Sequence, residues 1–209
     1  MGGPSDTRDI GGVTLTKIAV GEMHNNAYLL VDGTGQGLLI DAAAEPERLL
    51  AMIGDTPVGK IVTTHQHPDH WQALAAVKAA TGAVTVAHPA DAPGIPVPTD
   101  ELVGDGGTIS FGDTVLSVTH LVGHTPGSIA LTLGADSAAP HLFTGDCLFP
   151  GGVGNTQQDP ARFSSLYADV VSKIFDRLPD ATWVYPGHGG DTTLGAQRPH
   201  LAEWRERGW

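Results

Sequence analysis

Short apolar segments separated by polar turns run through most of the chain. Residues 13–20 alternate apolar with polar or small side chains, which is typical of a half-buried strand. Residues 27–31 and 38–40 flank the polar, Gly-rich segment 32–37, which predicts a hairpin. Similar patterns predict further strands at residues 60–63, 83–86, 108–111, 114–121, 128–133, 141–143 and 182–185.

A second pattern, with apolar residues three or four positions apart, predicts helices. It is clearest over residues 163–178, and helices are also expected at 45–53, 69–81 and 201–207. Since strands come before, between and after the helices, we expect a mixed α/β fold with two sheet regions. We assign residues 1–11, which are polar and Gly-rich, to a flexible tail and residues 12–209 to a single domain.

Composition narrows the class of protein. The 209 residues include 11 basic and 23 acidic side chains, a net charge of −12 that argues against a nucleic-acid partner. The single cysteine excludes an intrachain disulfide. No apolar run approaches the roughly 18 residues of a membrane span, and no apolar signal segment opens the chain. We therefore expect a cytoplasmic protein with a small-molecule substrate and no membrane or nucleic-acid partner.

The ten histidines are the residues that change this picture, because imidazole is a common metal ligand. Residues 64–70 read Thr-His-Gln-His-Pro-Asp-His and follow a predicted strand. His65, His67, Asp69 and His70 are four potential ligands within six residues. A loop between a strand and a helix can direct such side chains to one point. Imidazole and carboxylate groups together suit zinc, iron or manganese.

Three distant polar residues stand in similar places. His124, Asp146 and His188 each lie in a Gly-containing turn beside an apolar strand. Functional side chains commonly collect on loops that a rigid scaffold positions. We therefore expect all three to converge on the residue 64–70 motif.

These blocks, in this order, resemble the metallo-β-lactamase superfamily, most of all the glyoxalase II-like hydrolases, over about residues 15–198. The resemblance implies a four-layer αββα sandwich with metals at one edge between the sheets. It also implies the ligand sets, which are His65, His67 and His124 for metal 1, Asp69, His70 and His188 for metal 2, and Asp146 as a bridge between both.

Chemical reasoning agrees with two metals. Seven ligands are too many for one tetrahedral zinc but suit two divalent ions, with zinc expected and iron or manganese as alternatives. The surplus positive charge should lower the pKa of a bridging water and so give a hydroxide at neutral pH. Asp69 and Asp146 are the expected catalytic residues that position it. Trp71 and Phe149 lie next to ligands and are expected either to form an apolar substrate wall or to pack in the core.

The expected activity is hydrolysis of a thioester, an S-acyl conjugate of a small thiol, by that bridging hydroxide. The chain ends 21 residues after His188, so we do not expect the helical domain that helps glyoxalase II to hold glutathione. Three alternatives stay open. They are a mononuclear iron persulfide dioxygenase, a lactone or other ester hydrolase of the same superfamily, and a non-catalytic metal-binding domain.

Overall fold

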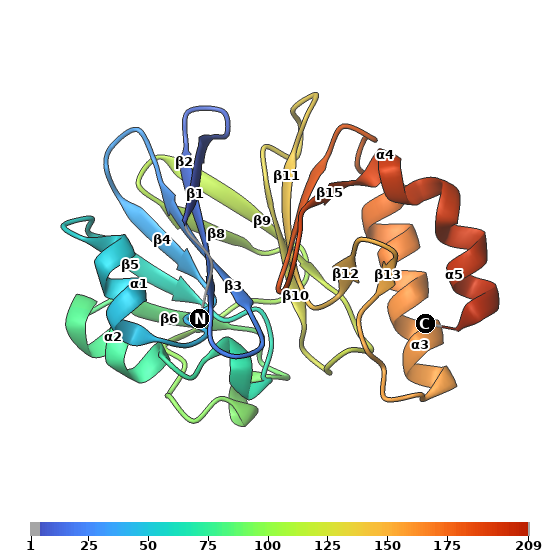
Figure 1. Cartoon of the computed structure of the whole chain (residues 1–209), viewed down its shortest axis with the longest axis horizontal. Coiled ribbons are helices and arrows are strands. Elements are labelled where there is room, and N and C mark those ends of the chain that lie inside the picture. Colours follow the sequence, from blue (N-terminus) through green and yellow to red (C-terminus); the bar gives the residue numbers. More distant parts are fainter. Residues whose placement is uncertain (1–4, 209) are drawn as a thin grey trace.

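Two β-sheets face each other, and helices cover the outer side of each sheet (Figure 1). The structure, a computed structural model, describes residues 5–208. Within that range the first sheet has seven strands in the order β1-β2-β3-β4-β5-β6-β7. These strands are β1 (Asp6–Asp9), β2 (Thr14–Val20), β3 (Asn25–Val31), β4 (Gly37–Ile40), β5 (Val58–Val62), β6 (Val84–Ala87) and β7 (Glu101–Leu102).

The second sheet has six strands in the described range, in the order β15-β14-β11-β10-β9-β8, and a short two-stranded ribbon lies beside it. The six strands are β8 (Thr108–Phe111), β9 (Thr114–His120), β10 (Ile129–Leu133), β11 (His141–Gly145), β14 (Trp183–Pro186) and β15 (Thr192–Thr193). The ribbon pairs β12 (Leu148–Phe149) with β13 (Gly152–Val153).

The helices divide between the two outer faces. Those on the first sheet are α1 (Pro46–Ile53) and α2 (Leu74–Thr81), and those on the second are α3 (Pro160–Asp169), α4 (Leu194–Gln197) and α5 (Leu201–Arg207). A π-helical segment, Val170–Phe175, continues α3. Short 3-10 turns lie at Pro68–His70, Ala92–Gly94 and Arg198–His200. The expected four-layer αββα sandwich is therefore confirmed.

Buried strands supply side chains to two apolar layers at once. In β4, Leu38 and Ile40 join the core between the sheets, whereas Leu39 packs with the helices outside. In β11, Phe143 lies between the sheets and Leu142 faces the outer helices. Successive strand residues point to opposite faces, so a strand covered on both sides is apolar throughout. This is why the central strands lack the alternation of residues 13–20.

The expectation of a flexible tail over residues 1–11 is wrong for its second half. Asp6–Asp9 forms β1 and pairs antiparallel with β2, where Thr7 faces Thr16. The polar side chains gave no apolar signal, since the strand lies at the sheet edge and most of its residues are exposed. Residues 1–4 lie outside the described part of the chain.

The helix expected over residues 69–81 is also divided. Pro68–His70 is a single 3-10 turn, and α2 begins only at Leu74. The backbone N–H groups of Gln72 and Ala73 donate to the carbonyls of Ala43 and Ala42 rather than to a preceding helical turn. These tertiary hydrogen bonds hold the ligand loop against the segment after β4. The helix expected over 163–178 begins earlier, at Pro160, and becomes π-helical from Val170.

Parallel strand pairs decide where polar side chains meet. β4 pairs parallel with β5 in one sheet, and β11 pairs parallel with β14 in the other. Carboxyl ends of parallel neighbours lie at the same sheet edge. Asp41, His65, Asp146 and His188 follow these four strands within three residues of their ends, and their side chains gather at one place.

Candidate metal centre

Three histidines from two loops form the first ligand group. His65 Nε2 lies 3.1 Å from His67 Nδ1 and 3.2 Å from His124 Nε2. His65 and His67 come from the loop after β5, and His124 comes from the loop between β9 and β10. Ring nitrogens of all three residues lie within 4.8 Å of one another, close enough to hold a single ion.

Asp69, His70 and His188 form the second group. His188 Nε2 lies 3.3 Å from Asp69 Oδ2, and His70 Nε2 lies 3.7 Å from the same oxygen. Ligand atoms of these three residues also lie within 4.8 Å of one another. The two groups are neighbours, because the rings of His65 and His70 are 4.1 Å apart between centroids.

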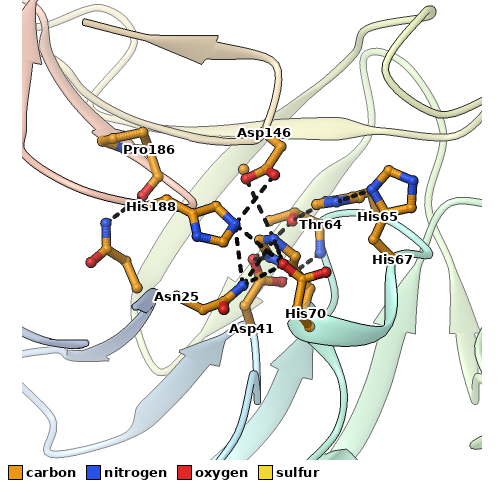
Figure 2. A network of polar contacts seen from close by, with 12 residues as sticks. Asn25, Asp41, Thr64, His65, His67, His70, Asp146, Pro186 and His188 are labelled. Atoms are coloured by element: carbon orange, nitrogen blue, oxygen red, sulfur yellow. Dashed lines mark hydrogen bonds and ion pairs between the residues drawn. The ribbon is translucent and has the colours of Figure 1, made fainter. Parts of the chain in front are cut away.

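Asp146 connects the two groups. Its Oδ1 lies 3.4 Å from His70 Nε2, and its Oδ2 lies 3.4 Å from His188 Nε2 (Figure 2). Oδ2 also lies 3.8 Å from His124 Nε2. Oδ1 is buried and has no hydrogen-bond partner among the described residues. A buried carboxylate oxygen without a donor suits a metal ligand, since an ion would satisfy it.

Gly187 leaves room for this carboxylate. A Cβ at this position would collide with Asp146 Oδ1 and lie 2.8 Å from Cε1 of His70. The glycine thus lets the backbone before His188 approach both ligand groups. The donor set and the space around it fit metal ions, and the structure brings together all seven residues that the sequence indicated.

Hydrogen bonds on the far side of the rings orient the ligand nitrogens. Nδ1 of His124 donates to the carbonyl of Asn155 at 2.8 Å, and Nδ1 of His188 donates to the carbonyl of Met23 at 3.0 Å. Because a carbonyl only accepts, each neutral ring presents an Nε2 lone pair to the cluster. Such a second contact is typical of metal-binding histidines.

The two groups differ electrostatically. Burial lowers the pKa of His65, His67 and His124, so these imidazoles are neutral near pH 7. Burial also opposes the charged form of His70, but Asp41 and Asp146 raise its pKa more strongly, to about 10. The pKa of His188 is likewise raised to about 10, against the effect of burial, by Asp146 and Asp69.

The carboxylates of the second group respond in the opposite direction. A hydrogen bond with His188 lowers the pKa of Asp69 far below its usual value. Burial raises the pKa of Asp146, but contacts with His188 and His70 outweigh it and hold that pKa well below the usual range. Both carboxylates therefore stay ionised, as metal ligands must.

Sequence analysis missed two residues that contact the second group. Asp41 Oδ2 accepts hydrogen bonds from His70 Nδ1 and Thr64 Oγ1, both at 2.8 Å. Asn25 Nδ2 donates to Asp69 Oδ2 at 2.8 Å and lies 3.2 Å from His188 Nε2. Asp41 directly follows β4, so its place after an apolar strand was a usable signal. Asn25 begins β3, and nothing in its sequence neighbourhood distinguishes it.

A third missed residue, Asp91, joins the two loops of the first group. Its Oδ2 accepts from the backbone N–H of Gln66 at 3.0 Å and from Thr125 Oγ1 at 2.5 Å. Its Oδ1 accepts from the N–H of Gly127 at 2.7 Å. Asp91 is fully buried, and Gln66 lies between two ligands while Thr125 follows a third. This carboxylate thus fixes the relative position of the two ligand loops.

The two aromatic residues expected near the substrate have different surroundings. Trp71 packs against the outer core over the first sheet and donates from Nε1 to the carbonyl of Gln66 at 2.8 Å. Phe149 is partly exposed, and its ring centroid lies 6.4 Å from that of His188. Phe149 therefore borders the second ligand group, whereas Trp71 supports the loop from behind.

Comparisons with known proteins agree with this geometry. The sequence profile described as the Metallo-beta-lactamase superfamily matches residues 20–188. The chain belongs to this superfamily, a family of metallo-hydrolases that includes glyoxalase II-like members, and the resemblance seen in the sequence is confirmed.

One sequence relative and two solved structures are similar to most of this chain. The chain is 36% identical to a hydroxyacylglutathione hydrolase of Polaromonas sp. in an alignment 176 positions long, which covers 82% of this chain and 65% of that protein. It is similar to the crystal structure of ETHE1 from Myxococcus xanthus (TM-score 0.80, 30% identity), with 92% of this chain and 84% of that one covered. A di-iron-bound structure, TTHA1623, aligns with a TM-score of 0.72 at 34% identity over 87% of this chain and 96% of that one.

Proposed function

We propose that this protein is a dinuclear metal-dependent hydrolase that cleaves a thioester, an S-acyl conjugate of a small thiol. The observation that carries the proposal is the position of Asp146, whose two oxygens face both ligand groups. The hydroxyacylglutathione hydrolase relatives support the choice of a thioester. A lactone or another ester is the alternative substrate for a hydrolase of this kind.

His65, His67 and His124 would hold one ion, Asp69, His70 and His188 would hold the other, and Asp146 would contact both. Two divalent ions there would polarise the thioester carbonyl and make hydroxide available at neutral pH. We propose zinc as the native metal, with iron or manganese as alternatives, and the di-iron-bound relative keeps iron prominent among them.

The chain's own residues would orient the reactants. Asp69 and Asp146 remain ionised, so their oxygens can accept hydrogen bonds from the attacking water and hold a lone pair toward the carbonyl carbon. The water oxygen adds to that carbon and the carbon–sulfur bond breaks, so that the sulfur leaves as a thiolate. One of the water's protons is taken up by the thiolate and the other passes to solvent, and the products are a carboxylate, a thiol and one proton. A thiolate is a good leaving group, so this step needs no general acid.

Metal analysis of purified protein, combined with hydrolysis of thioesters, lactones and β-lactams, tests the proposal. We expect about two divalent ions per chain and thioester hydrolysis in excess of the other substrates. A stoichiometry that stays at one ion when zinc, iron or manganese is supplied in excess would refute the dinuclear site. Oxygen consumption with a persulfide, in the absence of thioester hydrolysis, would favour the mononuclear iron dioxygenase instead.

No helix in the described residues is both long and apolar enough to cross a membrane. We propose a small-molecule substrate and a cytoplasmic location, in line with the acidic composition and the single buried cysteine. Cell fractionation with a tagged chain tests the location.

A further inference from the structure

Arg162 lies beside the first ligand group. It is in the first turn of α3, whose N-terminus is capped by the Asp159 side chain. Arg162 Nε donates to the carbonyl of Gly123 at 2.8 Å, and Nη2 donates to the carbonyl of His124. These two bonds fix the guanidinium plane against the loop that carries His124. Nη1 has no hydrogen-bond partner within residues 5–208.

Arg162 lines a cavity of about 440 Å³, and two proposed metal ligands line the same cavity. These ligands are His67 and His124, and Gln66 and Gln157 also line the cavity. Among the described residues that line this cavity, Arg162 is the single arginine or lysine, and no aspartate or glutamate lines it. A group bound to Arg162 would therefore lie in the same cavity as the ligands of metal 1.

Arg162 also lacks a carboxylate partner, which is unusual in this acidic chain. Most basic side chains form an ion pair within the described residues. Arg177 and Arg205 also form no ion pair within the described residues, but both are exposed to solvent, whereas Arg162 is half-buried. A half-buried, fixed guanidinium with a free N–H edge matches a carboxylate in charge and shape.

We infer that the substrate carries a carboxylate, or a group of similar charge, that Arg162 binds while the scissile carbonyl lies at the metal ligands. This inference rests on the proposed thioester hydrolysis and names a substrate class for it. Arg162 would be a specificity-determining residue. Its two bonds to backbone carbonyls preorganise the guanidinium, so little side-chain freedom is lost on binding. A purely structural Arg162 would instead support every substrate equally.

The test compares thioesters that differ only in charge. On the acyl side, the succinyl thioester of N-acetylcysteamine is paired with its neutral carboxamide. On the thiol side, the S-acetyl thioester of 3-mercaptopropanoate is paired with the S-acetyl thioester of 3-mercaptopropanamide. For each pair the ratio of kcat/KM for acid over amide is measured with the metal-loaded protein. We expect a preference for the acid of about tenfold or more in one pair, and that pair locates the carboxylate.

Arg162→Gln should reduce this preference to near one, and Arg162→Lys should retain part of it because the charge remains. Arg198→Gln is the matched control, since Arg198 also donates to two backbone carbonyls but contacts Phe175, Leu178 and Asp180 outside this cavity. It should leave the ratio unchanged. Circular dichroism and metal content establish that each variant is folded and loaded.

The possible results distinguish a failure of the carboxylate inference from a failure of the proposed thioester hydrolysis. If the native protein hydrolyses acid and amide equally in both pairs, the inference is wrong while thioester hydrolysis stands, and this result needs no variant to fold. If Arg162→Gln slows acid and amide by the same factor, Arg162 is a structural clamp and the inference is also wrong. If no thioester of either pair is hydrolysed, the proposed function itself fails.

Discussion

Asp41 and His70 form a buried pair in which Oδ2 of the carboxylate lies 2.8 Å from Nδ1 of the imidazole. The same carboxylate accepts from the backbone and side chain of Thr64, the residue before the first ligand. His70 is therefore fixed in orientation, with Nε2 toward Asp69 and Asp146. The contact raises the electron density on the ring and stabilises one tautomer.

Replacing this carboxylate by an amide should weaken the second metal site. Asp41 has φ of 58°, a backbone conformation that asparagine tolerates, so Asp41→Asn changes the charge with little backbone strain. We expect metal affinity at the second site to fall by about 10- to 100-fold. Calorimetric zinc titration would measure it. Two unchanged binding constants would show that Asp41 has no part in holding the metal.

Removing a proposed ligand should empty that site outright. In Asp69→Ala, the second group loses its carboxylate while the three histidines of the first group are untouched. We expect one ion per chain, an unchanged circular dichroism spectrum, and thioester turnover lower by about 10² to 10³, which corresponds to about 3 to 4 kcal/mol of transition-state stabilisation. The exposed Asp55→Ala serves as control. Full metal content with near-native turnover in Asp69→Ala would contradict the two-metal mechanism.

Metal binding should release protons from the second group. In the metal-free protein the pKa values of His70 and His188 are raised to about 10, so both rings are protonated at pH 7. An ion needs the neutral rings, and its apparent affinity should therefore increase as pH rises toward 10. At pH 7 we expect about two protons released at this site. Calorimetry in buffers of different ionisation enthalpy counts them, and no proton release at pH 7 would contradict the assignment.

Asp91 should support the first site in the way that Asp41 supports the second. In Asp91→Asn one oxygen is replaced by an amide nitrogen, which would face an N–H or O–H donor instead of accepting from it. We expect a loss of about 1 to 3 kcal/mol in the free energy of unfolding of the metal-free protein, measured with urea. In an Asp69→Ala background, zinc binding to the remaining three-histidine site should also weaken.

A pair of variants at the hydroxyl partner of Asp91 gives the control. Thr125→Ser keeps the hydroxyl that donates to Asp91, whereas Thr125→Val has the same shape without it. Thr125→Ser should behave like the native protein, and Thr125→Val should lose part of the zinc affinity. Equal behaviour of both variants would show that this hydrogen bond does not position the ligand loop.

Features with local causes could be predicted from the amino-acid sequence. Alternating or continuous apolar segments located most strands within a few residues, because burial on one or both faces imposes those patterns. The residue 64–70 motif indicated metal chemistry because four potential ligands lie within six positions. His124, Asp146 and His188 could be predicted as further ligands because each lies next to an apolar strand.

How these segments meet depends on contacts between residues that are distant in the chain. β1 is polar and becomes a strand through backbone pairing with β2, and the ligand helix is shortened by hydrogen bonds from Gln72 and Ala73 to another loop. Asp41, Asp91 and Arg162 form hydrogen bonds with residues of the ligand loops that lie 23 to 39 positions away in the chain. Such contacts leave no periodic trace in the sequence, because they depend on which strand ends share an edge.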